Sequence, residues 1–543
     1  MTIPRTRSSI PALVCFLFTV WAPIRLAAAQ NLPVGDVMED YARYLQLVEQ
    51  IPSFSFNIRP LPIRDLYGEL DAVAIHPWRN RMDFLRRMTH QKGLALSAFD
   101  PEVRLFWNST RPFGMNDASV WQGRGATLAL SSGAFLRIGP LSASLRPTIL
   151  YNQNRAFEQW SESSFQHPTY SSIDMPERFG PDPFTTFDLG QSYIRLDYKG
   201  LAVGLSNENM WWGPALHNPI VMSNNAPGFP HLFLGTSGPQ NIWIGQIQTR
   251  WIWGELTESD YFDENPDNDK RLITGIVLDF APALIPGLSF GLTRIYTFYR
   301  PNTLTSDDFL LVFQAFLKKN TTQSNGGDQK DQILSAYLRW LVPESGLEIY
   351  GELGRGDHSE DFRDFFLEFE HGTGYTLGLQ KAFVGPWDKD MRLSAEITRL
   401  QHPKTSLLRN PHPTGSYFYT HSGVRQGYTQ LGQVIGAGIG PGSNSQIVAL
   451  DLFESWGKAG LYARRTTLNA DYFYYIQYPI VNAEDEMGVD ITTGLNAYVF
   501  WGKYELGASL AFSQLLNQQF EHKRDASNLN ATLTIRRTLV GPR

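Results

Sequence analysis

From about residue 96 to the end of the chain, apolar and polar side chains alternate with a period of two. In the run 347–353, Leu347, Ile349 and Leu353 fall on one face of an extended chain, whereas Glu348 and Glu352 fall on the other. Similar alternation occupies 141–152, 288–292, 391–398 and 529–535. Because glutamate does not fit the core of a β-sandwich, this pattern predicts strands that face solvent or a wet lumen.

The connections between these runs are of two kinds. Short turns separate some runs, as at 343–346 and 501–503, and long polar stretches separate others, as at 158–189, 259–271, 320–330 and 402–427. Alternation of short turns and long loops is typical of a transmembrane barrel. With strands of about 10 residues, the region holds roughly 16–20 of them. The fold class that we predict is therefore all-β, a large antiparallel transmembrane β-barrel over residues 96–543.

The segment before the barrel has a helical period. Asp36 with Glu39 three residues later fits an acidic capping box, and Pro52 marks the end of the helix. Apolar residues recur at spacings of four and three at Val34, Met38, Tyr41, Leu45 and Val48. Two weaker helices are predicted over 63–73 and 78–88. None is long enough to stand alone, so we expect residues 30–95 to form a small periplasmic helical bundle or to pack against the barrel.

The N-terminus has the pattern of a secretory signal. Arg5 and Arg7 precede a short apolar run at 10–21, and small residues follow at 27–29. We expect cleavage after Ala29, with residues 1–29 as the signal peptide. A retained anchor is the alternative, but a membrane-spanning helix needs roughly 20 apolar residues.

Composition excludes several kinds of site. Cys15, inside the expected signal, is the only cysteine, which excludes disulfides and thiolate metal sites from the mature chain. Removal of the signal takes away three arginines and no acid, so the formal charge of −6 becomes −9. Nucleic acid is disfavoured as a partner because binding to phosphates needs a basic excess. No cofactor is expected, and an aromatic content of 13% fits the girdles of a barrel.

The densest group of candidate binding residues lies at 207–231. Tryptophan faces stack on sugar rings, while amide and carboxylate groups hydrogen-bond the sugar hydroxyls. The alternative is a girdle of rim aromatics with a structural loop folded into the lumen. The candidate polysaccharide-binding residues are Trp211, Trp212, Asn224, Asn225, Glu208 and His231.

Catalysis has weaker support. Glu208 with Glu255 or Asp260 is a conceivable glycosidase pair, but a chain with 53 carboxylates contains many such pairs by chance. Ser223 lacks the G-x-S-x-G elbow of serine hydrolases. The glycines of 436–442 lack the ending of a phosphate-binding loop, so a tight turn or a close backbone approach is the better interpretation.

Several blocks of the sequence resemble the Wzi-type capsule-assembly proteins. Together they span most of the mature chain in the expected order. The blocks are 45–47 with 56–60, 107–109 with 116–117 and 121–125, 206–213 with 222–231, and 427–429 with 432–445.

The resemblance implies a bacterial outer-membrane barrel of about 18 strands that acts as a surface lectin and retains capsular or exopolysaccharide during capsule assembly. We accordingly predict a non-enzymatic monomer in contact with outer-membrane lipid, with weak multivalent sugar contacts. Basic loops near Arg425 or near Lys318 and Lys319 are candidate contacts for an acidic polysaccharide. A sugar-selective or general porin and an outer-membrane glycan hydrolase are the alternatives.

Overall fold

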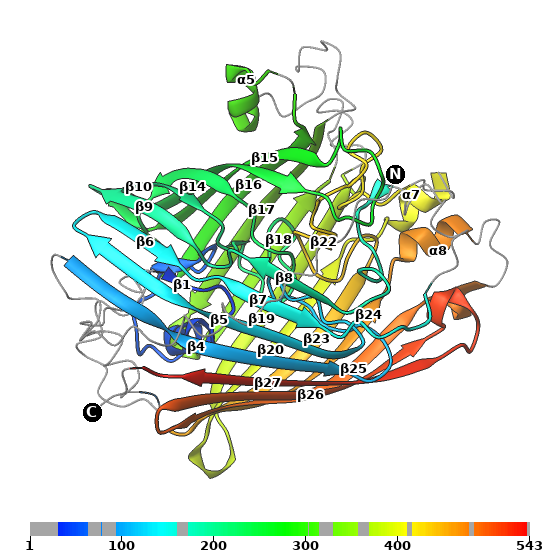
Figure 1. Ribbon diagram of the computed structural model, residues 1–543. Helices are drawn as coiled ribbons and strands as arrows, with labels where there is room; N and C mark the ends of the chain where they lie inside the picture. Colours follow the sequence, from blue (N-terminus) through cyan, green and yellow to red (C-terminus); the bar gives the residue numbers. More distant parts are fainter. Residues whose placement is uncertain are drawn as a thin grey trace, which may run out of the picture.

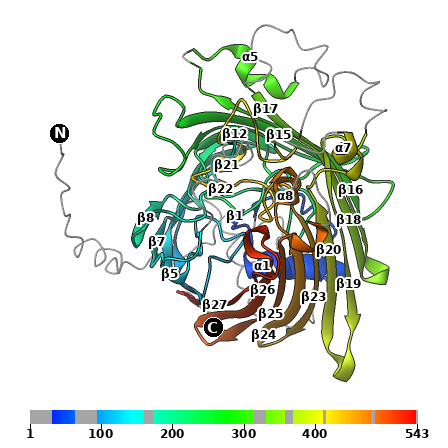
Figure 2. The same ribbon diagram turned by 90° about the vertical axis from the view of Figure 1, so that its right-hand side faces the viewer.

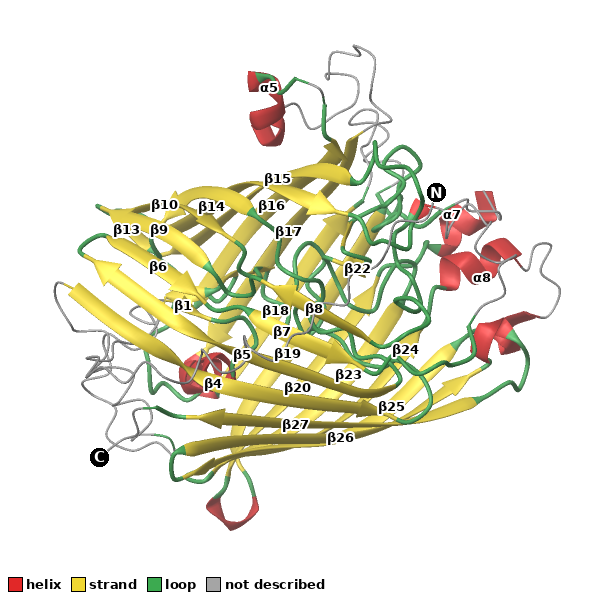
Figure 3. Ribbon diagram, viewed as in Figure 1, coloured by secondary structure: helices red, strands yellow, loops and turns green. Residues whose placement is uncertain are grey.

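The computed structural model describes residues 31–62, 78, 94–159, 172–301, 303–313, 330–356, 369–409, 415–476 and 483–539. The expected signal peptide, most of the second and third expected helices, and Lys318 and Lys319 lie outside these residues. The described strands form a closed antiparallel barrel with few helices (Figures 1 and 3). No helix among the described residues is long and apolar enough to cross a membrane.

The described part of the barrel has eighteen strands, which confirms the expected number. Three of the eighteen are interrupted and so appear as the pairs β6 and β7, β8 and β9, and β12 and β13. The segments are β4 (Leu94–Asn108), β5 (Gly125–Ile138), β6 (Leu141–Leu145), β7 (Thr148–Asn152), β8 (Phe184–Asp188), β9 (Tyr193–Tyr198), β10 (Leu201–Ser206), β12 (His231–Thr236), β13 (Gln240–Ile242), β14 (Gly245–Thr257), β15 (Lys270–Pro282), β16 (Leu288–Tyr299), β17 (Lys330–Val342), β18 (Leu347–Arg355), β19 (Thr373–Val384), β20 (Asp390–Arg399), β23 (Asn444–Glu454), β24 (Gly457–Thr467), β25 (Val489–Trp501), β26 (Tyr504–Leu516) and β27 (Ala526–Arg537).

Antiparallel pairing of β27 with β4 closes the barrel. Long loops join the strands at one end and short turns at the other, as the sequence predicted. The long loops belong to the connections 109–124, 153–183, 207–230, 258–269, 300–329, 356–372, 400–443, 468–488 and 517–525, of which residues 160–171, 302, 314–329, 357–368, 410–414 and 477–482 lie outside the described part of the chain. In barrels of this kind the short turns are periplasmic and the long loops extracellular, so we name the two ends the turn end and the outer end.

The strands alternate as the sequence predicted. On β18, Ile349 is 39% exposed on the outside of the barrel, whereas Glu348 on the inside is fully buried. On β20, Leu393 and Ile397 face outward and Arg392 faces inward. An apolar outer surface around a polar interior is the arrangement that lipid requires of a barrel.

The remaining elements lie inside the barrel or at its ends. The long loops carry α5 (Ser306–Phe309), η4 (Leu311–Phe313), β21 (Thr429–Gln430), β22 (Gln433–Val434), α7 (Lys404–Arg409), α8 (Ala470–Ile476), η9 (Ala483–Glu486) and η10 (Gln518–Phe520), and the turns carry η7 (Pro343–Ser345) and η8 (Pro386–Asp388). The lumen holds β1 (Asn31–Leu32), α1 (Val37–Leu47), β2 (Ile58–Arg59), β3 (Leu61–Pro62) and β11 (Trp211–Trp212).

The first expected helix is α1, which lies within the ring of strands (Figure 2). The Asp36 side chain caps it by accepting a hydrogen bond from the Met38 amide at 2.9 Å, and Glu39 accepts one from the Gly35 amide at 2.8 Å. Its apolar face, including Tyr41 and Tyr44, packs against Phe453 of the barrel wall. Packing against the barrel is therefore the arrangement found for this helix.

Candidate functional site

Two chain segments fill the middle of the lumen. Residues 207–230, which we call the lumen segment, fold inward from the outer end, and β11 within them pairs with β2 of the N-terminal segment, residues 31–62. Side chains of the lumen segment share one buried apolar cluster with residues from 418–439 and with the barrel wall. An open lumen is what the porin alternative requires, and this packing within the described part of the chain opposes it.

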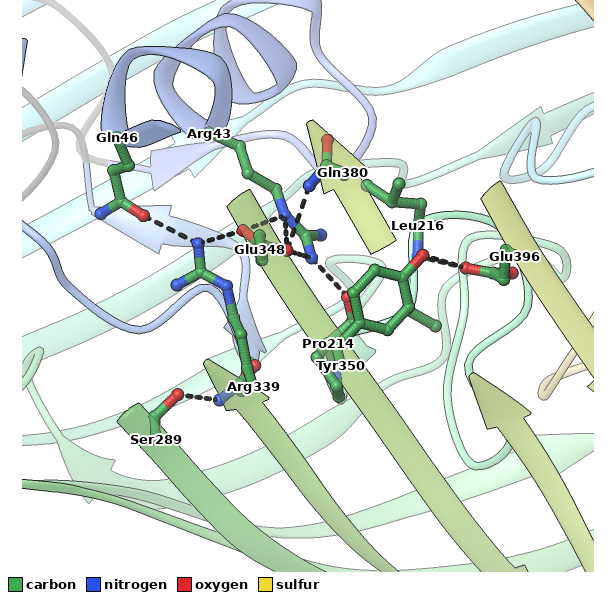
Figure 4. A network of polar contacts seen from close by, with 12 residues as sticks. Arg43, Gln46, Pro214, Leu216, Ser289, Arg339, Glu348, Tyr350, Gln380 and Glu396 are labelled. Atoms are coloured by element: carbon green, nitrogen blue, oxygen red, sulfur yellow. Dashed lines mark hydrogen bonds and ion pairs between the residues drawn. The ribbon is translucent and has the colours of Figure 1, made fainter. Parts of the chain in front are cut away.

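A buried glutamate joins the N-terminal segment to the wall. Glu348 of β18 accepts hydrogen bonds from Arg43 Nε of α1 at 3.0 Å and from Arg339 Nη2 of β17 at 2.6 Å (Figure 4). Gln380 Nε2 donates to the same carboxylate at 3.0 Å. Arg43 Nη2 also donates to the carbonyl of Pro214 in the lumen segment at 2.6 Å. Buried charges need such partners, so this group fixes both lumen-filling segments to the wall.

A second glutamate binds the backbone of the lumen segment. Glu396 of β20 accepts hydrogen bonds from the amide of Leu216 at 2.7 Å and from that of Asn218 at 2.8 Å. The Tyr350 hydroxyl donates to the same carboxylate at 2.8 Å (Figure 4). The inward glutamates that the alternation predicted therefore do not line a wet lumen here, because they bind polar groups of the chain itself.

The two predicted tryptophans lie in this buried region. Trp212 is 0% exposed and belongs to the central apolar cluster. Trp211 is also buried, and the Arg59 guanidinium lies 4.4 Å from the centre of its ring. The carboxylate of Glu208 accepts hydrogen bonds from Asn31 Nδ2 at 3.0 Å and from the Ser206 hydroxyl at 3.2 Å. Burial raises the pKa of Glu208, although the bond from Asn31 opposes the rise.

The other predicted site residues also bind within the chain. Asn224 Nδ2 donates to the Asn116 carbonyl and Asn225 Nδ2 donates to the Val434 carbonyl, both at 3.0 Å. His231 is buried, with Nδ1 2.9 Å from the Phe229 carbonyl oxygen. Five of the six residues therefore lie in the lumen segment itself and His231 follows it directly at the start of β12, as the alternative of a structural loop folded into the lumen described. Their direct contact with sugar stays a prediction.

The glycine-rich stretch makes the close approach that we expected of it. A β-carbon on Gly436 would lie 2.4 Å from the Ile220 carbonyl oxygen, and one on Gly438 would lie 2.6 Å from Asn225 Oδ1. Only glycine lets residues 436–438 approach the lumen segment so closely.

The residues considered for catalysis have other partners. The hydroxyl of Ser223 donates to the carbonyls of Ile435 at 3.2 Å and Gly436 at 2.5 Å, and it also accepts from an amide. Glu255, at the outer end of β14, forms ion pairs with Lys270 and Arg300. These contacts give neither residue the activated environment of a nucleophile or an acid catalyst.

Sequence reasoning missed a cluster of aromatic side chains at the outer end. Trp121 comes from loop 109–124, Phe179 from loop 153–183, Phe184 from the start of β8, and Tyr261 from loop 258–269. The ring of Phe179 lies 4.9 Å from that of Trp121 and 5.9 Å from that of Tyr261, and the rings of Trp121 and Phe184 stack at 6.2 Å. We call these four residues the outer cluster. Trp121 belongs to one of the blocks that carry the family resemblance, which was the available signal.

The outer cluster offers both apolar surface and free polar groups. Tyr261 is 49% exposed, and the other three rings are partly exposed. Within the described residues, the indole N–H of Trp121 has no hydrogen-bond partner. The exposed Arg425 stacks over Phe262, next to Tyr261, with 5.7 Å between its guanidinium carbon and the ring centre. Partly exposed rings, with one cation and one free indole donor nearby, are suited to the faces and hydroxyls of sugars.

Two comparisons with known proteins, one with family models and one with solved structures, match this chain. A family model described as capsule assembly protein Wzi matches residues 109–529. Among solved structures, the chain is similar to Wzi of Escherichia coli, described as a carbohydrate-binding outer-membrane β-barrel involved in group 1 capsule assembly. The TM-score is 0.63 at 13% identity, covering 94% of this chain and 100% of that one.

The chain is less similar to other outer-membrane barrels. OprD of Pseudomonas aeruginosa has a TM-score of 0.40 at 9% identity, covering 82% of this chain and 95% of that one. A BenF-like porin of Pseudomonas fluorescens has a TM-score of 0.40 at 11% identity, covering 82% and 99%. No curated protein matches the sequence significantly.

Proposed function

Because the chain belongs to the capsule assembly protein Wzi family, we propose that it binds capsular or related exopolysaccharide at the outer face of the bacterial outer membrane and retains it there. The observation that carries this proposal is a half-exposed aromatic cluster at the outer end of a barrel whose lumen is filled. Such a barrel presents a binding surface, whereas a pore needs a continuous water path.

The outer cluster supports binding through many weak contacts. Trp121 and Tyr261 offer ring faces to a polysaccharide that passes over the outer end, and Arg425 adds a positive charge nearby. Each contact is weak, but a polymer meets many copies of the chain, so the contacts add up to retention. Trp211 and Trp212 would need the lumen segment to move before they touched a sugar, so we propose the outer cluster as the first point of contact.

Surface polysaccharide measured in a deletion strain tests retention. Complementation with the parent chain should keep polysaccharide on the cells, and deletion should move it into the medium without changing the total. The measurement is flow cytometry of the cells together with quantification of the released polymer. Equal surface and released pools in the two strains would contradict retention.

Substitution then tests the outer cluster itself. The double variant Trp121→Ala with Tyr261→Ala should release polysaccharide as the deletion does. Trp387→Ala is the matched control, because Trp387 is 88% exposed but lies in a turn at the opposite end. Both variants should be present in the membrane in parental amounts. Normal retention by the double variant would remove the outer cluster from the proposal.

A further inference from the structure

A polar cavity of about 430 Å³ lies in the lumen beside the filled region. Its walls come from loop 109–124, from Leu216–Asn218 of the lumen segment, and from the inward faces of β20 and β23–β27. This volume lies toward the lower end of the roughly 300–1,000 Å³ typical of small-molecule sites. It suits a short saccharide or the end of a chain better than a polymer that passes through.

The lining of the cavity has the chemistry of a saccharide site. Carboxamides line it from several elements, and this group can both donate to and accept from sugar hydroxyls. The amide nitrogens of Asn116, Gln122 and Asn530 already donate within the chain. The side-chain oxygens of Asn116 and Asn218 are buried and have no hydrogen-bond partner among the described residues. Aromatic rings from Phe113 and Tyr462 add apolar surface. The carboxamides are those of Asn116, Gln122, Asn218, Asn496 and Asn530.

Two of the cations in the cavity are already neutralised. Arg392 lies 2.7 Å from Asp40 and 2.6 Å from Asp451, measured between nitrogen and oxygen atoms. Lys458 lies 2.7 Å from Asp40 and 3.0 Å from Asp451. These four residues form a compact group at the turn side of the cavity, and their charges cancel.

The third cation has no such partner. No carboxylate of the described residues lies within ion-pair distance of Arg464. Its guanidinium carbon lies 5.2 Å from the centre of the Phe113 ring, and Nη1 lies 3.9 Å from the sulfur of Met115. Its Nε is buried and has no hydrogen-bond partner in the described part of the chain. The carboxylate whose charge acts on Arg464 is that of Asp490, which already pairs with Arg111 and accepts a hydrogen bond from the Ser513 hydroxyl at 2.8 Å. Asp117, which also lines the cavity, accepts a hydrogen bond from Gln122 at 2.6 Å.

We propose that this cavity binds an acidic sugar, a saccharide unit that carries a carboxylate, and that Arg464 is the residue that recognises the carboxylate. Arginine matches a carboxylate with two parallel hydrogen bonds, and a partly buried cation gains more from an anion than an exposed one does. The proposal rests on the proposed function and deepens it, because it names the class of sugar and a second place of contact.

Binding to the purified full-length chain in detergent tests the cavity. The probes are a short oligosaccharide that contains glucuronate and its counterpart that contains glucose. The parent should bind the acidic probe more tightly. Arg464→Gln should lower the affinity for the acidic probe at least about tenfold, as expected for the loss of hydrogen bonds to a charged group. Its affinity for the neutral probe should equal that of the parent.

The matched control is the next residue of the same strand. Arg465 is exposed on the opposite face of β24, where Nη1 donates to Gln446 Oε1 at 3.0 Å. Arg465→Gln should bind both probes as the parent does. Barrel folding of each variant is verified by its heat-dependent shift in gel mobility.

Each contrary result has its own meaning. The proposal would be overturned if Arg464→Gln bound the acidic probe as tightly as the parent does. It would also be overturned if the substitution lowered the affinities for both probes equally. If the parent bound neither probe while cells still needed the chain to retain polysaccharide, the cavity proposal would fail and retention would stand. If the acidic probe bound as expected while deletion changed neither surface nor released polysaccharide, the proposed function would fail instead.

Discussion

Replacement of Glu348 by glutamine should loosen the N-terminal segment while leaving the barrel closed. The carboxylate is fully buried and is the anionic partner of both Arg43 and Arg339. Glutamine keeps the shape of the side chain and removes its negative charge. The guanidinium groups of Arg43 and Arg339 then remain buried without an anionic partner at this position. Loss of one partner of a buried ion pair costs about 3–5 kcal/mol.

The lower end of that range applies here, since both arginines keep other acceptors. Arg43 retains the Pro214 carbonyl, and Arg339 retains Gln46 Oε1 at 2.9 Å and the Phe54 carbonyl at 3.1 Å. A cost of about 3 kcal/mol raises the equilibrium constant for release of α1 from the lumen about a hundredfold.

Thiol labelling measures that release. Ala42 in α1 is fully buried, so a cysteine at this position reacts with a maleimide only when the helix leaves its place. In a Cys15→Ser, Ala42→Cys background, Glu348→Gln should therefore raise the labelling rate about a hundredfold, provided that the helix returns faster than it is labelled.

The exposed pair at the outer end supplies the control. Glu255→Gln removes a carboxylate that bridges Lys270 and Arg300 near the surface, and surface pairs contribute little. Its labelling rate should match that of the parent. A rate in Glu348→Gln within twofold of the parent, in a folded barrel, would refute the view that this carboxylate holds the segment.

Three further predictions concern the filling of the lumen. Burial alone would raise the pKa of Asp40, but its two cationic partners hold it below the ordinary 3.8. The ion pairs therefore stabilise α1 fully above that pH, and this stabilisation falls progressively as the pH drops below 3.8 toward the lowered pKa. Hydrogen exchange of α1, corrected for its intrinsic rate, should accordingly accelerate progressively below about pH 4. In the Asp40→Asn variant, hydrogen exchange of α1 should already be fast at neutral pH, and it should not accelerate further on acidification beyond the intrinsic rate. Trp212→Ala should destabilise the lumen segment by about 3–5 kcal/mol, measured as faster proteolysis, whereas Trp387→Ala should leave it unchanged. Gly436→Ala should cost about 1–3 kcal/mol through its clash with Ile220, measured by the same assay.

Much of the barrel is predictable from local patterns. Alternation along 347–353 gives both the strand and its two faces, because side chains on a strand point to opposite sides in turn. The positions of short turns and long loops likewise follow from composition. These features depend on neighbours in the sequence, so they needed no knowledge of the tertiary structure.

The filling of the lumen depends on contacts between distant parts of the chain. Trp211 and Trp212 have the composition of a sugar site, but pairing with residues 58 and 59 buries them. The alternation predicted that Glu348 and Glu396 line a wet lumen. In the structure Glu348 binds Arg43 and Glu396 binds the Leu216 amide, and both partners lie far away in the sequence. The alternation of apolar and polar residues cannot identify such partners. A barrel filled by protein and a barrel filled by water both require polar residues at the inward positions.

Arg536 near the end of β27 binds across the line where the barrel closes. Its guanidinium pairs with Glu102 of β4 at 2.7 Å, with Glu505 of β26 at 3.2 Å, and with Asp36 of the N-terminal segment at 2.9 Å. Arg536 of β27 is thus joined both to the neighbouring strands of the barrel wall and to the N-terminal segment inside the lumen. A barrel that closed while empty would lack one of these three carboxylates. Filling of the lumen therefore also stabilises the closure of the barrel, because the seam keeps its third ion pair only while the N-terminal segment is in place.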